Sequence, residues 1–221
     1  MKSTRDTIHD ELRKRLTSGY YPPDASLVPL ALSEEFAVSR TPVREALALL
    51  ERDGLLVPTR RGFALRPRSD DEMLELFQIQ AVLDATAAES AALRRGPVEL
   101  ARLDVLLEHA ESLDDPAEIR RSLNDWHDTV RRAARNGTVV AFLHTLDAQV
   151  KTSAPWRTPA APDTFTAAFA EHRTVTEAIR AQDAEAARVA MLAHHGHDRD
   201  RRIRQRVRAD RTRPPERGTD S

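Results

Sequence analysis

Three histidines are the first residues of this chain whose type and spacing could do chemistry. His127, His172 and His194 each lie in the apolar stripe of a segment with helical periodicity. A single histidine on such a face is usually an ordinary core residue, but three that point inward each need a buried partner. Three neutral imidazoles that converge could hold a divalent transition metal such as Zn²⁺ or Ni²⁺ and leave a position open for a ligand.

A group of arginines is the second candidate, in the segment VSRTPVREALALLERDGLL, residues 38–56. Pro42 is tolerated in the first turn of a helix, which predicts that a helix begins near residues 39–41. The apolar residues of this helix fall on one face, whereas Arg44 falls on the opposite face and Arg40 lies at the tip. A helix start that exposes hydroxyls, arginines and free backbone N–H groups is a phosphate-binding surface.

Three helices and a hairpin are expected to position these arginines. The helices are predicted around Ile8, Leu12 and Leu16, over residues 28–37, and over residues 41–52. Two short apolar runs follow, at residues 55–57 and 63–65, and they predict a β-hairpin.

The predicted hairpin places Arg60 and Arg61 at its tip and Gly62 where a positive φ would be needed. An arginine pair most often only solvates a helix face, but that role does not explain the preceding turn or the basic hairpin. The combination favours a winged helix-turn-helix, in which the first residues of the third helix meet base edges in a major groove.

The rest of the chain predicts an all-helical antiparallel bundle, so the fold class is mainly α. Residues 1–66 form the winged helix-turn-helix, residues 67–70 a linker, residues 71–208 the bundle, and residues 209–221 a disordered tail. Few aromatic residues, 5% of the chain, and abundant alanine indicate closely packed helices. The bundle helices are predicted over residues 71–95, 97–113, 116–135, 138–151, 163–181 and 183–208.

Composition excludes several kinds of protein. The net charge is −1, and residues 1–66 hold 11 Lys and Arg against 9 Asp and Glu, so the chain as a whole is not a basic coat for nucleic acid. There is no cysteine, the amino terminus is polar, and no apolar run approaches the roughly 18 residues that a membrane helix needs. We therefore expect a cytoplasmic protein without a membrane segment.

Enzymatic motifs are missing from the sequence. There are only 7 glycines, and no nucleophile elbow or Gly-rich phosphate loop is present. A metal-dependent hydrolase that uses His127, His172 and His194 remains as an alternative. It would lack an inward-facing carboxylate to act as general base.

The stretch LALSEEFAVSRTPVREALALLERDGLLVPTRRGFAL resembles the winged-helix domain of the GntR family of bacterial transcriptional regulators. The resemblance covers about residues 5–66. In many relatives a polar or basic residue stands where this chain has Leu30, so one DNA contact of the family is missing. The DNA contacts that the resemblance implies are Ser39, Arg40, Thr41, Arg44, Arg60, Arg61 and Gly62.

Residues 71–208 are similar to the effector domain of the FadR-type branch, the FCD domain. The similarity lies in AVLDATAAESAAL, NDWHDTVRRAARN and EHRTVTEAIRAQDAEAARVAMLAHH. Members with a metal use three histidines, which match His127, His172 and His194, and an aspartate one helical turn before the first.

This chain departs from the FCD pattern at two positions. Leu123 stands where metal-binding members have their aspartate, with Asn124 one residue off register. Gln80 stands where relatives often place an arginine that faces the ligand. The resemblance implies an effector pocket that includes Gln80 and Asn124, and either a divalent metal (Zn²⁺ or Ni²⁺) or histidines that hydrogen-bond the effector directly.

Together the two resemblances imply a ligand-responsive DNA-binding regulator, more often a repressor than an activator. One recognition helix makes few base contacts, so a homodimer on an inverted-repeat, double-stranded operator is expected. A small-molecule effector in the helical domain would modulate the affinity for DNA.

Overall fold

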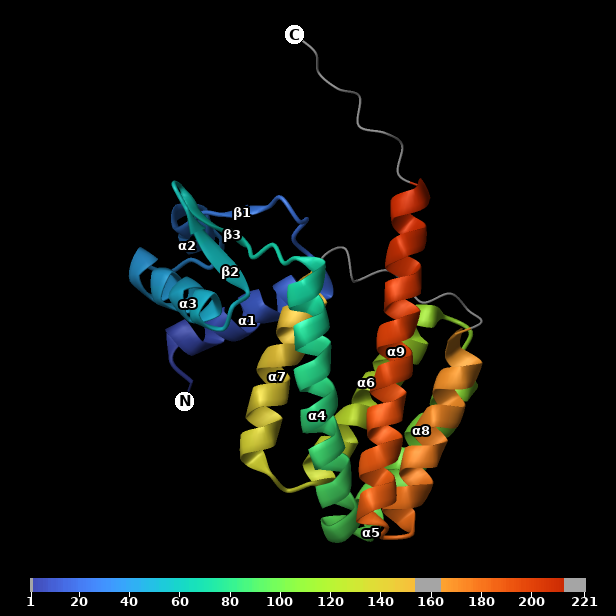
Figure 1. Ribbon diagram of the computed structural model, residues 1–221. Helices are drawn as coiled ribbons and strands as arrows, with labels where there is room; N and C mark the ends of the chain where they lie inside the picture. The colour runs from blue at the N-terminus through green and yellow to red at the C-terminus, as the bar shows by residue number, and fades with distance from the viewer. Residues whose placement is uncertain (1, 154–163, 213–221) are drawn as a thin grey trace. The chain divides into compact units, whose positions relative to one another are not determined.

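The computed structural model describes residues 2–153 and 164–212 (Figure 1). The predicted mainly helical fold with a small winged sheet is confirmed. Within the described residues the elements are α1 (Thr4–Ser18), β1 (Ser26–Leu27), α2 (Pro29–Glu35), α3 (Arg40–Arg52), β2 (Leu56–Thr59), β3 (Gly62–Leu65), α4 (Asp70–Arg94), α5 (Pro97–Glu111), α6 (Pro116–Ala133), α7 (Gly137–Thr152), α8 (Thr164–Arg180) and α9 (Ala184–Thr212).

Backbone contacts group these elements into two compact units. The first contains α1 to β3, the beginning of α4 as far as Gln80, and α7 from Thr138. The second contains α4 from Ala81 onward together with α5, α6, α8 and α9. The domain boundary predicted at residues 67–70 stays a prediction. Helix α7 belongs to the same unit as the winged helix, although α7 follows much later in the chain.

The core of the first unit joins α1, α3 and the small sheet. The apolar face predicted for α3 is buried there, and Ala148 of α7 contributes to the same core. Polar contacts add to this packing, because Arg13 donates to the carbonyl of His144 (2.6 Å) and Gln149 donates to the carbonyl of Asp53 (2.8 Å). The buried core residues are Ile8, Leu12, Leu16, Leu27, Leu32, Val43, Ala46, Leu47, Leu50, Leu55, Leu56, Leu65 and Ala148.

The sheet has three antiparallel strands in the order β1-β3-β2. The hairpin was expected from the sequence, with Thr59 opposite Gly62 next to its turn. Strand β1 was not expected, since its two residues are too few to show a periodicity; it pairs Ser26 with Ala64.

The backbone conformation predicted for Gly62 is wrong. Positive φ among the described glycines occurs at Gly19 and Gly54 and not at Gly62. A Cβ atom at Gly62 would lie 2.4 Å from the carbonyl oxygen of Leu27, well inside van der Waals contact. Glycine is therefore needed here because β1 passes close to the backbone, and not for a left-handed turn.

The turn that leads into α3 uses a residue other than glycine. Ala37 has φ 52°, and the N–H groups of Ala37 and Val38 donate to the carbonyls of Glu34 and Ser33 at the end of α2. These hydrogen bonds close α2 and reverse the chain. The turn places Ser39 at the N-cap position of α3.

The second unit packs its helices around alanines and one large aromatic residue. Helix α5 packs against α6 and α8, and α8 lies beside α9, as Figure 1 shows. On α4 the alanines Ala85, Ala88, Ala91 and Ala92 are buried, which lets neighbouring helices approach closely. Trp126 of α6 is fully buried and donates to the hydroxyl of Thr176 (3.1 Å).

The ends of two helices differ from the prediction. Helix α9 continues to Thr212, so residues 209–212, predicted to be part of the tail, are helical. Helix α8 begins at Thr164, and the predicted helical residue Asp163, the Pro-containing loop and residues 213–221 lie outside the described residues. Among the described helices none combines the length and the apolarity needed to cross a bilayer.

Candidate functional site

The first candidate site is the exposed beginning of α3. Ser39 is the N-cap residue, but its hydroxyl makes no capping hydrogen bond, so it stays available to a ligand. Ser39, Arg40, Thr41 and Arg44 are all exposed, whereas the opposite face of the helix is buried. The burial fixes which face of α3 points outward.

The arginines of this site have no partner among the described residues. No hydrogen bond or ion pair within residues 2–153 and 164–212 engages Arg40, Arg44, Arg60 or Arg61. Several other arginines of the same unit are paired, as in the hydrogen bond from Arg15 to Glu11 (2.8 Å). Unpaired guanidinium groups beside free helix N–H groups are suited to phosphate and base edges.

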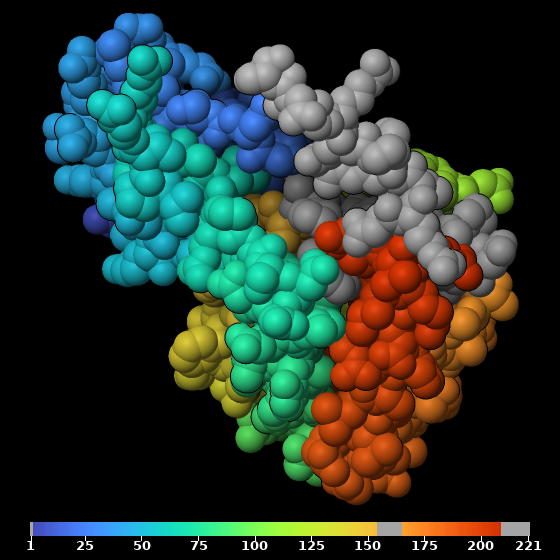
Figure 2. All heavy atoms as spheres, turned by 45° about the horizontal axis from the view of Figure 1, so that its top comes forward, coloured from blue at the N-terminus to red at the C-terminus, as the bar shows by residue number. Residues whose placement is uncertain are grey.

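The wing carries two of these cations. Arg60 and Arg61 form the turn between β2 and β3 and are exposed. In the space-filling view the hairpin stands out from the surface of its unit (Figure 2). Leu30, which replaces a polar or basic residue of many relatives, is 43% exposed at the beginning of α2. Ser39, Thr41 and the arginines are therefore exposed where the predicted DNA contacts need them. Leu30 is exposed too, but its apolar side chain offers no polar contact.

The second candidate site is a cluster of histidines in the second unit. Helices α6, α8 and α9 bring His127, His172 and His194 together, with ring centroids 4.4 Å apart for His172 and His194 and 5.1 Å apart for His127 and His172. One ring nitrogen from each lies within 4.8 Å of the others. The convergence expected from three apolar stripes is therefore present.

Hydrogen bonds fix the ring tautomers of two of these histidines. Nδ1 of His172 lies 2.6 Å from the carbonyl oxygen of Ala168, and Nδ1 of His194 lies 2.9 Å from the carboxylate of Glu171. Both acceptors require an N–H at Nδ1, which leaves Nε2 with a lone pair. Nε2 of His172 is buried and has no hydrogen-bond partner among the described residues, and the same holds for Nδ1 of His127.

The electrostatics keep these imidazoles neutral. Burial lowers the pKa of His172 to about 3, and repulsion from the neighbouring His194 ring, when that ring is protonated, acts in the same direction. Burial also lowers the pKa of His127 well below its ordinary value, with His172 and His194 adding to the effect. Although burial opposes it, hydrogen bonds from His194 and Arg201 lower the pKa of Glu171 to about 2. Neutral rings beside an ionised carboxylate are the forms that metal coordination requires.

The effector-pocket roles predicted for Gln80 and Asn124 stay predictions. Leu123 is buried one turn before His127, as expected, but Asn124 is exposed because one residue rotates the helix by about 100°. Gln80 belongs to the first unit and donates to Asp147 (2.6 Å).

Two residues that the sequence analysis did not single out adjoin the cluster. Asp84 of α4 is almost fully buried and forms two hydrogen bonds with the guanidinium of Arg131 (2.7 and 2.8 Å). Its Oδ2 lies 3.1 Å from Nε2 of His195. Burial would raise the pKa of Asp84, but Arg131 and His195 lower it to about 2. The signals in the sequence were an acidic residue inside an alanine-rich run and the second histidine of a pair.

A divalent transition metal fits the three-histidine set. Buried ring nitrogens without partners, on rings held by a carbonyl and a carboxylate, are the donors that such ions take. Three protein ligands would leave positions open on the ion, to which a small anionic or polar molecule could bind. Without a metal, the same nitrogens could accept hydrogen bonds from a ligand.

Comparisons with known proteins give matches along most of the chain. The model described as "Bacterial regulatory proteins, gntR family" matches residues 4–64, and the FCD domain matches residues 75–197, more than half of the chain. Both matches fall on the segments whose resemblance was drawn from the sequence.

Similar proteins are regulators of transcription. The chain is 27% identical over 196 residues to the uncharacterized HTH-type transcriptional regulator YdhC of Bacillus subtilis (strain 168), which covers 86% of this chain and 87% of that protein. It is 26% identical over 200 residues to the probable D-xylose utilization operon transcriptional repressor of Paenarthrobacter nicotinovorans, 87% of each chain. The solved structure of E. coli McbR/YncC has the same fold, with a TM-score of 0.78, 21% identity, and coverage of 93% of this chain and 99% of that one.

Proposed function

Because the chain belongs to the gntR family of bacterial regulatory proteins and carries an FCD domain, we propose that it binds an inverted-repeat operator as a homodimer. It is a DNA-binding transcriptional regulator and not an enzyme, and the hydrolase alternative finds no support among the relatives. We further propose that it represses transcription, as the relatives named repressors do, and that a small molecule in the FCD domain changes its affinity for DNA.

The observation that carries the operator contact is the set of unpaired arginines on a rigid helix. Arg40 and Arg44 lie where α3 begins, and the opposite face of α3 is anchored by side chains without exposed surface. A helix held in this way can enter a major groove with little loss of conformational entropy, because its backbone is already ordered. The wing arginines would contact the DNA backbone beside it.

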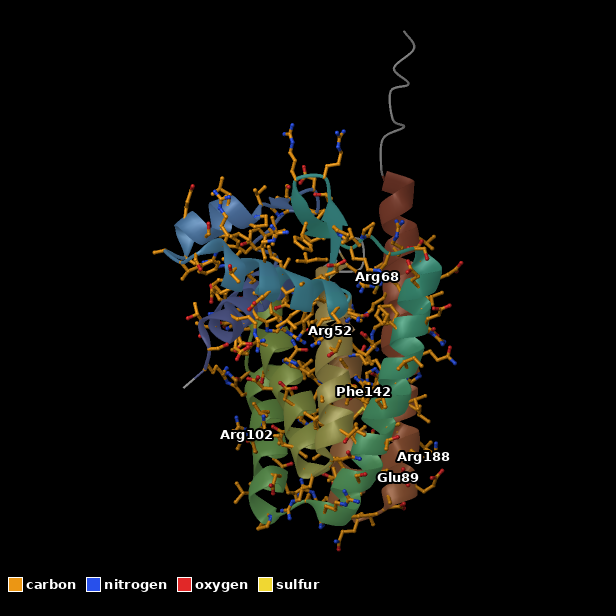
Figure 3. All side chains as sticks on the ribbon, turned by 90° about the vertical axis from the view of Figure 1, so that its left-hand side faces the viewer. Arg52, Arg68, Glu89, Arg102, Phe142 and Arg188 are labelled. Carbon is orange, nitrogen blue, oxygen red and sulfur yellow. The ribbon has the colours of Figure 1, made fainter. Side chains whose placement is uncertain are left out.

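The test measures binding of the full chain to a duplex that the protein selects from a random pool, with fluorescence anisotropy as the readout. Arg40→Ala and Arg44→Ala should each weaken binding by about 1–3 kcal/mol, the range for a lost base contact. Arg52→Ala is the matched control, since it removes the same exposed charge at the other end of α3, about 18 Å along the helix axis. Figure 3 marks Arg52.

The comparison between sequences decides what the arginines do. A loss on the selected duplex that exceeds the loss on random duplex supports base contact, whereas equal losses mean phosphate contact alone. If Arg40→Ala and Arg44→Ala bind the selected duplex as well as Arg52→Ala does, the assignment of α3 is wrong. Circular dichroism and melting should stay unchanged in all three variants, because these side chains are exposed.

The homodimer follows from the small number of contacts that one recognition helix can make. Two helices related by a dyad double those contacts and match an inverted repeat. Size-exclusion chromatography with light scattering should therefore give about twice the 24.8 kDa of one chain. A monomer at micromolar concentration that still binds the selected duplex without cooperativity would contradict the dimer.

For the helical domain we propose that His127, His172 and His194 hold a divalent ion such as Zn²⁺ or Ni²⁺ to which the effector binds. A ligand there changes DNA affinity only if it binds one arrangement of the regulator better than another. Elemental analysis of protein purified without chelator should find the metal, and His172→Ala should remove it. Absence of metal, together with no uptake of added Zn²⁺ or Ni²⁺, would leave only direct hydrogen bonding to the effector.

A further inference from the structure

A second group of potential ligands adjoins the three-histidine set. Asp84 of α4, His127 of α6 and His195 of α9 each offer one ligand atom, and these atoms lie within 4.8 Å of one another. Asp84 is 1% exposed. The chain thus has a buried carboxylate at the cluster although Leu123 stands where metal-binding relatives have their aspartate.

The spacing of two of these atoms is that of neighbouring ligands on one ion. Asp84 Oδ2 and His195 Nε2 lie 3.1 Å apart, and Nε2 is buried without a hydrogen bond of good geometry among the described residues. Two donor atoms that each lie about 2.0–2.2 Å from a metal ion are themselves about 3.0–3.4 Å apart at the angles of four- and six-coordinate sites. In the tautomer that carries its proton on Nδ1, the Nε2 atom of His195 has a lone pair that an ion beside Asp84 can take.

The ion pair with Arg131 is the competing role of Asp84. It uses one lone pair on each carboxylate oxygen and leaves the second pair on Oδ2 for another contact. Arg131 also lies 3.3 Å from the exposed carboxylate of Asp128, so it keeps a partner if Asp84 turns toward an ion. The pair with Arg131 therefore orients Asp84 and does not block it.

The helices that carry these ligands lie side by side. Figures 1 and 3 both show the end of α4 next to α9, and Figure 3 labels Glu89 and Arg188 close to one another there. The contact between Asp84 and His195 lies in the same layer of helices. His127 approaches from α6, so three helices would share one ion.

We propose that Asp84, His127 and His195 form a second metal-binding set, which overlaps the three-histidine set through His127 and takes a divalent ion of the Fe²⁺ or Mn²⁺ kind. Two imidazoles and one carboxylate are the donors that open Fe²⁺ sites use, whereas three imidazoles suit Zn²⁺ and Ni²⁺. Both sets include His127, so its ring is the ligand that they share. The proposal does not depend on DNA binding. It adds to the three-histidine site a second metal site with a different preference among divalent ions.

The experiment compares the two sets with two ions in the full chain. Mn²⁺ binding is followed by the electron paramagnetic resonance signal of free Mn²⁺, and Ni²⁺ binding by the metal-induced rise in melting temperature within each variant. His195→Ala and Asp84→Asn should weaken Mn²⁺ binding at least about 10-fold and spare Ni²⁺, whereas His172→Ala should weaken Ni²⁺ and spare Mn²⁺. Asp128→Asn is the control, because it removes the other carboxylate beside Arg131.

His195→Ala keeps the pair between Asp84 and Arg131 and so decides the question if Asp84→Asn does not fold. Wild-type protein that does not bind Mn²⁺, or variants at Asp84 and His195 that bind it like the wild type, would overturn the second set. Equal weakening of both ions in all variants of the cluster would also overturn it, since it would mean one mixed site. Wild-type protein that binds Mn²⁺ but not Ni²⁺ would contradict the three-histidine proposal and support the second set.

Discussion

At the scale of single residues, Leu123 has the largest consequence for the histidine cluster. It is buried on α6 one turn before His127, so its side chain faces the side from which metal-binding relatives supply a carboxylate. An ion held by three imidazoles alone has one protein ligand fewer than in those relatives. We therefore expect the ion to leave readily with chelator.

Leu123→Asp should restore the missing ligand and slow the loss of Ni²⁺ to a chelator. The same substitution should lower the stability of the metal-free protein by about 1–3 kcal/mol, because it buries a polar group without a partner. Chelator-driven release, followed by absorbance of the chelator complex, measures the first effect, and denaturant unfolding measures the second.

The control for this change is Leu123→Asn, which has nearly the same shape as the aspartate but no charge. It should destabilise the metal-free protein in a similar way without slowing the release of Ni²⁺. Release from Leu123→Asp at the wild-type rate would show that the ion is not held by the three histidines.

Residues whose role depends on one helix face were predictable. The sides of α3 and of the three histidine helices follow from periodicity alone, and His127, His172 and His194 converge as expected. Asp84 and His195 could not be assigned, because their role depends on which helices are neighbours and not on one helix. Asn124 is exposed, since a shift of one residue along a helix is enough to turn a side chain away from the buried face, and its role in an effector pocket stays a prediction.

At the scale of elements, the wing depends on the contact between β1 and β3. The carbonyl of Leu27 lies where a side chain at Gly62 would begin. Gly62→Ala should therefore force the strands apart and destabilise the protein by about 1–3 kcal/mol, the range for overpacking. Denaturant unfolding measures the loss, and DNA binding should weaken with it because the wing carries Arg60 and Arg61.

Gly137→Ala is the matched control at the first residue of α7, where a Cβ atom would meet no atom within 4 Å. It should leave stability unchanged or raise it slightly, because alanine favours helix over glycine. If both substitutions had the same effect on stability, the close approach of β1 would not be the reason for Gly62.

Elements that show a periodicity or a turn signal were predictable from the sequence, and β1 was not. The helices and the hairpin were found from such signals, whereas the two residues of β1 are too few to show a pattern. The predicted end of α9, at residue 208, came too early because the following residues are rich in arginine and poor in apolar side chains. The helix continues to Thr212. Charge alone does not end a helix that is already nucleated.

At the scale of the whole molecule, the buried histidines make stability depend on pH. The pKa of His172 is about 3 in the folded protein, so this ring stays neutral where an unfolded histidine binds a proton. Below about pH 6.5 the unfolded state binds more protons, and stability falls as the pH falls. His172 alone contributes a slope of up to about 1.4 kcal/mol per pH unit between about pH 6.5 and pH 3.

Denaturant unfolding of chelator-treated protein at several pH values between 7 and 5 measures this slope. This pH range lies above the one in which most carboxylates titrate. His172→Gln should reduce the slope by the share that His172 contributes, because glutamine does not bind a proton there, while His127, whose pKa burial also lowers, keeps its own share. His109→Gln, a change at an exposed histidine, should leave it unchanged. A slope that is the same in all three proteins would mean that burial of His172 does not control the acid sensitivity.

The grouping of α7 with the winged helix was beyond what the sequence could indicate. Its contacts join residues more than 90 positions apart, such as Gln149 and Asp53, and no local pattern reports such a pair. Arg68, marked in Figure 3, adds a further link, since it donates both to the carbonyl of Gly54 and to Ser153.

This grouping sets an order of events on the ribosome. The partners of Arg13 and Asp53 at His144 and Gln149 are translated only after the whole segment from Ala81 to Gly137 has been added, which takes about 3–11 s at ordinary elongation rates. During that interval the nascent winged helix lacks Ala148 in its core and keeps an apolar surface open. The winged helix is synthesised first, but its core is completed only when α7, which follows much later in the chain, has been synthesised.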